Sequence, residues 1–104
     1  MRLGYAYEKF NLVLKEMASS PQSIKDRIYN AYFHFHALKS GDLPQSSRQK
    51  YNKLMTKLTS VPAEENEGGV WASLNAMPDN QAEDLARIIV DLHDEIKIAN
   101  WGMK

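Results

Sequence analysis

The part of this chain that decides its fold reads Ile24-Lys-Asp-Arg-Ile-Tyr-Asn-Ala-Tyr-Phe-His-Phe-His-Ala-Leu38. One set of apolar residues in it recurs at helical spacing and predicts a helix with a buried stripe. This stripe consists of Ile24, Ile28, Ala31, Tyr32, Phe35 and Leu38. A second set with the same spacing, on another face, consists of Tyr29, Tyr32, Phe33 and His36. Because two faces of one helix then need neighbours, we expect it to be the most buried helix, and one neighbour can be another molecule.

Apolar residues at helical spacing also recur on both sides of this stretch, and no alternating β pattern of useful length is present. The further helices are predicted over Leu3 to Ala18, Pro44 to Ser60, Val70 to Met77 and Asp79 to Ala99. Ser20 and Pro21 predict the N-cap and first turn of the central helix, and Gly41 predicts its end near Ser40. We therefore expect an all-α fold, a compact bundle of four main helices plus one short helix with up-down connections, as a single domain over residues 1–104.

The apolar stripes also predict which side chains form the core. We expect the core to contain Phe10, Ile28, Phe35, Leu54, Leu85, Ile89 and Leu92. The short helix is expected to lie against this core through Val70, Trp71, Leu74 and Met77. Truncation of a core residue to Ala is expected to cost about 2–5 kcal/mol.

Charge is distributed unevenly along a chain whose net charge is zero. Residues 1–61 carry ten Lys and Arg against four Asp and Glu, and residues 62–104 carry three against nine. Attraction between these halves favours their packing, or head-to-tail docking of two chains, without a nucleic acid or a membrane. The chain has no Cys, so it needs no disulfides, and it has no long apolar run; we expect a cytoplasmic protein.

Ten aromatic residues are many for 104 residues, and five of them are Tyr and two are Trp. Tyr and Trp tolerate water in the free protein and anchor protein interfaces when bound. The face formed by Tyr29, Tyr32, Phe33 and His36 therefore has two interpretations, an aromatic part of the core or an interface. We favour a small non-enzymatic protein that acts through protein–protein contacts, as a homodimer through this face.

The predicted third helix has a basic face, which provides an alternative function. Arg48, Lys50, Lys53 and Lys57 lie on it, and no acidic residue occurs between Pro44 and Ser60. Such a face is typical of contact with a phosphate backbone, so the alternative is a nucleic-acid-associated regulator. The competing interpretation is a solvated face that balances the acidic half of the chain, and the neutral net charge favours it.

Metal and catalytic chemistry find little support in the sequence. His34 and His36 are two residues apart and point in different directions on a helix, and His93 is distant in the chain, so we predict no metal site and no cofactor. Glu64-x-x-Glu67 and Asp91-x-x-Asp94 resemble the paired acidic motifs of MazG-type nucleoside triphosphate pyrophosphatases, which hold magnesium between facing helices. Glu64 and Glu67 lie in a predicted loop between Pro62 and Gly68. A metal-dependent pyrophosphohydrolase is therefore a distant alternative, and we predict no catalytic residue.

Overall fold

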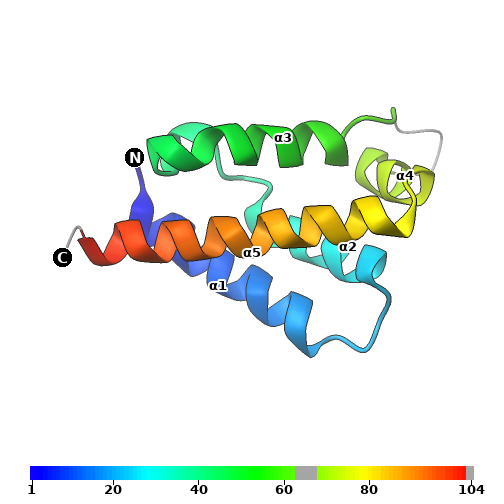
Figure 1. The fold of residues 1–104 in the computed structure, drawn as a ribbon, viewed down its shortest axis with the longest axis horizontal. Helices are drawn as coiled ribbons and strands as arrows, with labels where there is room; N and C mark the ends of the chain where they lie inside the picture. The colour runs from blue at the N-terminus through cyan, green and yellow to red at the C-terminus, as the bar shows by residue number, and fades with distance from the viewer. Residues whose placement is uncertain (63–67, 103–104) are drawn as a thin grey trace.

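The computed structural model describes residues 1–62 and 68–102 of the chain. These residues form five α-helices and two short 3₁₀ helices and contain no β-strand (Figure 1). In chain order the elements are α1 (Leu3–Ser19), α2 (Ile24–Phe35), η1 (Ser40–Asp42), η2 (Gln45–Ser47), α3 (Arg48–Leu58), α4 (Gly69–Ala76) and α5 (Asp79–Gly102). The predicted all-α fold is confirmed. No helix among the described residues is long and apolar enough to cross a membrane.

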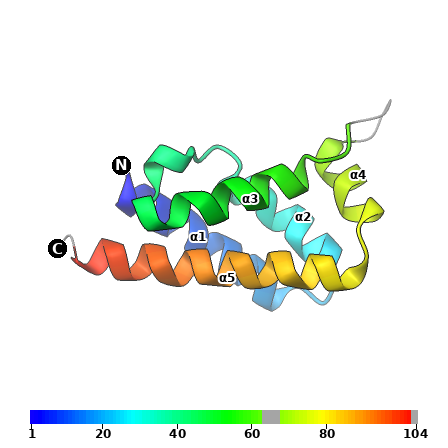
Figure 2. The ribbon, with the colours of Figure 1, turned by 45° about the horizontal axis from the view of Figure 1, so that its top comes forward.

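The longest helix, α5, extends along the molecule and organises the other elements around it. Helix α3 lies along one side of α5, and the antiparallel α1–α2 pair lies on the other (Figures 1 and 2). The short helix α4 lies near the start of α5, at the end of the molecule opposite to the two termini (Figure 1). Successive long helices therefore run in alternating directions, in line with the predicted up-down connections.

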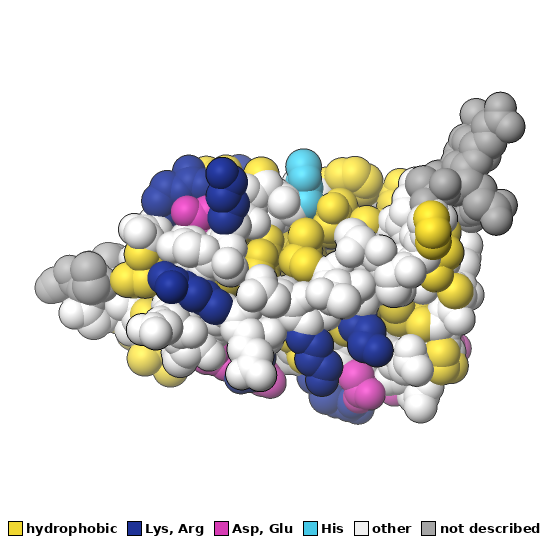
Figure 3. Space-filling view, turned by 90° about the horizontal axis from the view of Figure 1, so that it is seen from above, with side chains coloured by type: hydrophobic (Ala, Val, Ile, Leu, Met, Phe, Trp, Pro, Cys, Tyr) yellow, Lys and Arg dark blue, Asp and Glu magenta, His cyan; other side chains and the backbone are white. Residues whose placement is uncertain are grey.

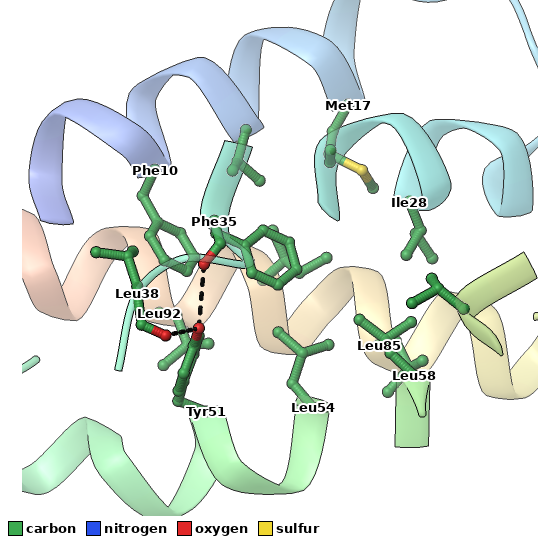
Figure 4. Close-up of a cluster of buried hydrophobic side chains, with 14 of the residues drawn as sticks. Phe10, Met17, Ile28, Phe35, Leu38, Tyr51, Leu54, Leu58, Leu85 and Leu92 are labelled. Atoms are coloured by element: carbon green, nitrogen blue, oxygen red, sulfur yellow. Dashed lines mark hydrogen bonds between the residues drawn. The ribbon is translucent and has the colours of Figure 1, made fainter. Parts of the chain in front are cut away.

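The core forms where the apolar faces of α1, α2, α3 and α5 meet (Figure 4). All seven residues predicted for it are buried, and the rings of Phe10 and Phe35 stack with their centroids 5.6 Å apart. Burial of each such side chain contributes about 1.5–3 kcal/mol to folding. Val70 and Leu74 of α4 and Met77 directly after it lie against this core as expected, whereas Trp71 is only half-buried.

Helix α2 begins and ends at residues other than those predicted. Its N-cap is Ser23, whose hydroxyl accepts the backbone N–H of Asp26 at 3.3 Å, so Ser20 and Pro21 lie in the connection before the helix. The helix ends at Phe35 because the following turn is held from another helix. The hydroxyl of Tyr51 in α3 donates to the carbonyl oxygens of Leu38 at 2.6 Å and Phe35 at 3.1 Å (Figure 4). The prediction of an end near Ser40 was therefore wrong.

The segment after α2 is fixed by Asp42, a nearly buried acid. Its carboxylate accepts from both Nε and Nη2 of Arg2 at 2.9 Å and from the backbone N–H of Lys39 at 3.0 Å. The hydrogen bonds from Arg2 and then from Lys39 hold the pKa of Asp42 well below its usual value of 3.8. Gly41 lies within η1 and does not have the left-handed φ that a glycine directly after a helix commonly adopts.

The remaining helix ends differ from the predictions by smaller amounts. The third helix begins at Arg48 rather than Pro44, because the residues after Pro44 form the 3₁₀ turn η2. The last helix continues through Gly102 instead of stopping at Ala99, so Gly102 is its last residue and not a cap beyond it. Helices α1 and α4 match their predicted ranges to within one residue at each end.

Candidate protein interface

The second face of α2 remains largely uncovered by the rest of the chain. The helix buries only Ile28, Ala31 and Phe35, so the prediction that it is the most buried helix was wrong. Tyr29 and Tyr32 are half-buried, and Phe33 and His36 are exposed. The reason is geometric: α1 and α5 cover the Ile28 side of α2, and α4 reaches only one end of its aromatic side.

Helix α4 adds a fifth ring to the aromatic face of α2. The ring centroid of Trp71 lies 5.3 Å from that of Tyr29, which in turn lies 5.1 Å from that of Phe33. Tyr32 continues the contact, with centroids 5.8 Å from Phe33 and 5.4 Å from His36. We call the group Tyr29, Tyr32, Phe33, His36 and Trp71 the aromatic patch. Most neighbouring rings within the aromatic patch meet edge to face, a geometry that aromatic pairs prefer.

Contacts with the core and with the junction after α4 fix the position of the aromatic patch. Lys25, one turn before Tyr29, donates from Nζ to the carbonyl oxygen of Met77 at 2.6 Å and lies 3.7 Å from a carboxylate oxygen of Asp79. This links α2 to the junction between α4 and α5. At the other end Tyr32 packs edge to face on the core residue Phe35, with centroids 5.6 Å apart. The aromatic patch is therefore supported by the core and by α4 before any partner binds.

The most exposed member of the aromatic patch is Phe33, with 55% of its surface accessible. Its ring nevertheless contacts the rings of Tyr29, Tyr32 and His36, so it stands on a layer of other aromatic side chains. In the space-filling view, hydrophobic side chains gather around a histidine and toward the α4 end, with most Lys and Arg side chains set apart from them (Figure 3). A supported, exposed apolar surface of this kind is typical of a contact site.

Sequence reasoning identified the α2 side of this surface but missed Trp71. We predicted that Trp71 lies against the core with Val70 and Leu74. Those two residues are four apart and share the buried face of α4, while Trp71 is offset by one residue and faces Tyr29. This offset was the available signal, but it does not by itself tell which neighbouring helix Trp71 meets.

The basic face of α3 is divided by its contacts. Lys50 forms an ion pair with Glu95 of α5, and the hydroxyl of Ser47 donates to the same carboxylate at 2.7 Å. The hydrogen bond to Glu95 raises the pKa of Lys50. Arg48 donates from Nε to the carbonyl oxygen of Leu43 at 3.2 Å. Only Lys53 and Lys57 are exposed without an ion-pair partner among the described residues, so the four basic residues do not form one uniform surface.

The described residues among those considered for metal or magnesium chemistry do not form a metal site. Glu64 and Glu67 lie outside the described residues, and Asp91 and Asp94 are exposed on α5. His34 is half-buried on α2, and no group of three His, Asp or Glu side chains in residues 1–62 and 68–102 could hold a metal ion. His93 has a structural environment: it is 6% exposed, and its Nε2 donates to Oδ1 of Asn11 of α1 at 2.8 Å.

Comparisons with protein-family models, with curated proteins and with solved structures give no match to this chain.

Proposed function

We propose that this chain is a non-enzymatic protein that acts through protein–protein contacts, with the aromatic patch as its contact surface and a second copy of the chain as its partner. The single observation that carries the proposal is Phe33, which is 55% exposed and stands on three other aromatic rings. Aromatic side chains of this kind lose little conformational entropy on binding and give a large buried area. We keep the cytoplasm as the proposed compartment, since a chain without Cys needs no oxidising one.

A symmetric dimer suits the chemistry of the aromatic patch. Its members carry no formal charge when His36 is neutral, so two copies of the patch do not repel each other. A two-fold axis near Phe33 places the same surface of both protomers in contact, as in most small homodimers. The rings of Tyr29 and Tyr32 each present an apolar face together with a hydroxyl group that can form hydrogen bonds at the rim.

The test is the molecular mass in solution, measured by light scattering at micromolar concentration. The wild type is expected at about twice the chain mass. Phe33→Asp places a carboxylate at the centre of the interface, where burial without a partner is costly, so we expect a helical monomer. Leu12→Asp is the matched control, because Leu12 is an exposed hydrophobic residue of α1 outside the aromatic patch, and it is expected to remain dimeric.

A monomeric wild type would contradict the homodimer and leave the aromatic patch for a different protein. If Leu12→Asp and Phe33→Asp dissociate the dimer equally, the aromatic patch is not the dimer interface. Nucleic-acid binding by α3 is the weaker proposal, because Lys50 is already paired with Glu95 and Arg48 is engaged with a backbone carbonyl.

A further inference from the structure

A groove between α3 and α5 provides a second surface, separate from the aromatic patch. One part of it is a cavity of about 230 Å³ whose apolar lining comes from Met77, Leu85 and Ile88. An adjoining cavity of about 260 Å³ extends toward α4. The two cavities share Lys57, Met77 and Gln81, so they form one elongated groove. The groove is elongated, and each of its two parts has room for single side chains of a bound peptide.

The charges that line this groove are not balanced. Lys53 and Lys57 of α3 both contribute to it, and no carboxylate of the described residues lies within ion-pair distance of either. Asp84 lies on the α5 side of the groove, but its carboxylate is paired with Arg87 at 2.5 Å. The groove therefore combines an apolar floor with two ammonium groups that have no ion-pair partner in residues 1–62 and 68–102.

We propose that this groove binds an acidic amphipathic peptide segment of a partner protein. An apolar side chain of the segment lies on Leu85 and Ile88, and flanking carboxylates pair with Lys53 and Lys57. Recognition by an apolar anchor and complementary charges is a common way for a groove between helices to bind a helical segment. A nucleic acid would use the two lysines but would leave the apolar floor without a partner, which makes it the less favoured ligand.

The probe is a blocked peptide of about 12 residues, roughly 18 Å long as a helix, that carries Glu and Leu in amphipathic spacing. Its matched peptide has Lys in place of every Glu. We expect the acidic peptide to bind and to change the NMR shifts of residues in the groove, and the basic peptide to bind more weakly. The double variant Lys53→Glu with Lys57→Glu loses two exposed ion pairs with the peptide, so we expect it to bind the acidic peptide about 2- to 30-fold more weakly.

The control is Lys15→Glu with Lys39→Glu, which makes the same change in net charge at exposed positions outside the groove. It is expected to change affinity less than about twofold, because charges beyond roughly 8 Å are screened at physiological salt. The proposal is overturned by equal binding of the two peptides, by no binding of the acidic one, or by equal losses in both variants. If a mixed-sequence oligonucleotide competes with the peptide for the same lysines, the ligand of the groove is a nucleic acid and the peptide proposal is wrong. If the groove variant alone changes the oligomeric mass, the groove binds a second copy of the chain and the peptide proposal is wrong.

Discussion

Replacement of Tyr51 by Phe tests how the turn after α2 is held. The phenol hydroxyl donates to the carbonyl oxygens of Leu38 at 2.6 Å and Phe35 at 3.1 Å, and Tyr51 is almost fully buried. The carbonyl of Phe35 keeps a second donor, the backbone N–H of Leu38 at 2.9 Å. The carbonyl of Leu38 has no other donor among the described residues. Tyr51→Phe therefore removes one hydroxyl and leaves one buried carbonyl oxygen unsatisfied.

The expected cost of Tyr51→Phe is about 1–3 kcal/mol, the penalty for a buried polar group that loses its hydrogen bond. At about 4–8 °C per kcal/mol for a domain near this size, the melting temperature is expected to fall by at least several degrees. Urea unfolding followed by circular dichroism measures the free energy directly. Tyr5→Phe is the control, because the Tyr5 hydroxyl makes no hydrogen bond within the described residues, and we expect it to change stability by less than about 0.5 kcal/mol.

The same substitution has a second signature in alkaline solution. Burial raises the pKa of Tyr51 far above its usual value of 10. The unfolded chain then releases this proton as the pH rises above about 10 while the folded chain keeps it, so ionisation of Tyr51 lowers the stability of the wild type there. Tyr51→Phe is expected to lose stability less steeply above pH 10 than the wild type. Unchanged unfolding at neutral pH together with an unchanged alkaline slope would refute the assigned role of Tyr51.

Three other predictions concern the core, the acid Asp42 and the basic face. Ile89→Ala is expected to lower the free energy of unfolding in urea by about 2–5 kcal/mol, because Ile89 is fully buried. An unchanged urea midpoint would show that Ile89 does not face the core and that the orientation of α5 described above is wrong. The pKa of Asp42 is lowered chiefly by the hydrogen bond from Arg2, so its contribution to the free energy of unfolding is present above pH 3.8 and is lost as the pH falls further. Asp42→Asn is therefore expected to lose less stability than the wild type on acidification below about pH 4, and equal stability profiles of the two proteins would contradict this. Replacement of the three α3 lysines by Gln is expected to leave DNA binding undetectable at about 0.15 M salt, as in the wild type, whereas tight binding that depends on these lysines would favour the nucleic-acid alternative.

Apolar periodicity was sufficient to predict the helices and the core. Phe10, Phe35 and Ile89 each belong to a stripe at helical spacing, and such a stripe has one physical outcome in a water-soluble helix, which is burial against another stripe. All three are buried. The number of helices and their order followed from the same signal, because each stripe is separated from the next by Pro, Gly or Ser residues.

The end of α2 could not be predicted, because distant residues determine it. Tyr51 lies 16 residues beyond Phe35, and Arg2 lies 40 residues before Asp42. The local sequence offered Gly41 as a helix end, and these long-range hydrogen bonds ended the helix earlier. The same applies to Lys50, whose partner Glu95 is 45 residues away, so its engagement was not visible from the basic face alone.

The aromatic patch lies between these two cases. The spacing of Tyr29, Tyr32, Phe33 and His36 predicted a shared face, and the contacts between their rings confirm that they lie together. Spacing could not tell whether that face was covered, because coverage depends on where α4 lies. The short helix reaches Tyr29 through Trp71 and leaves Phe33 exposed.

The most direct test of the homodimer uses an NMR sample in which isotope-labelled and unlabelled chains are mixed, so that only contacts between protomers are observed. A homodimer formed through the aromatic patch predicts intermolecular contacts from the ring of Phe33 to aromatic protons of Tyr29, Tyr32 or His36 of the second protomer. In Phe33→Asp no intermolecular contact from Tyr29, Tyr32 or His36 is expected, whereas a uniformly labelled sample of the same variant is expected to retain the contacts within its core. Intermolecular contacts confined to α1, α3 or α5, or none at all at millimolar concentration, would contradict the aromatic patch as the surface through which this protein associates.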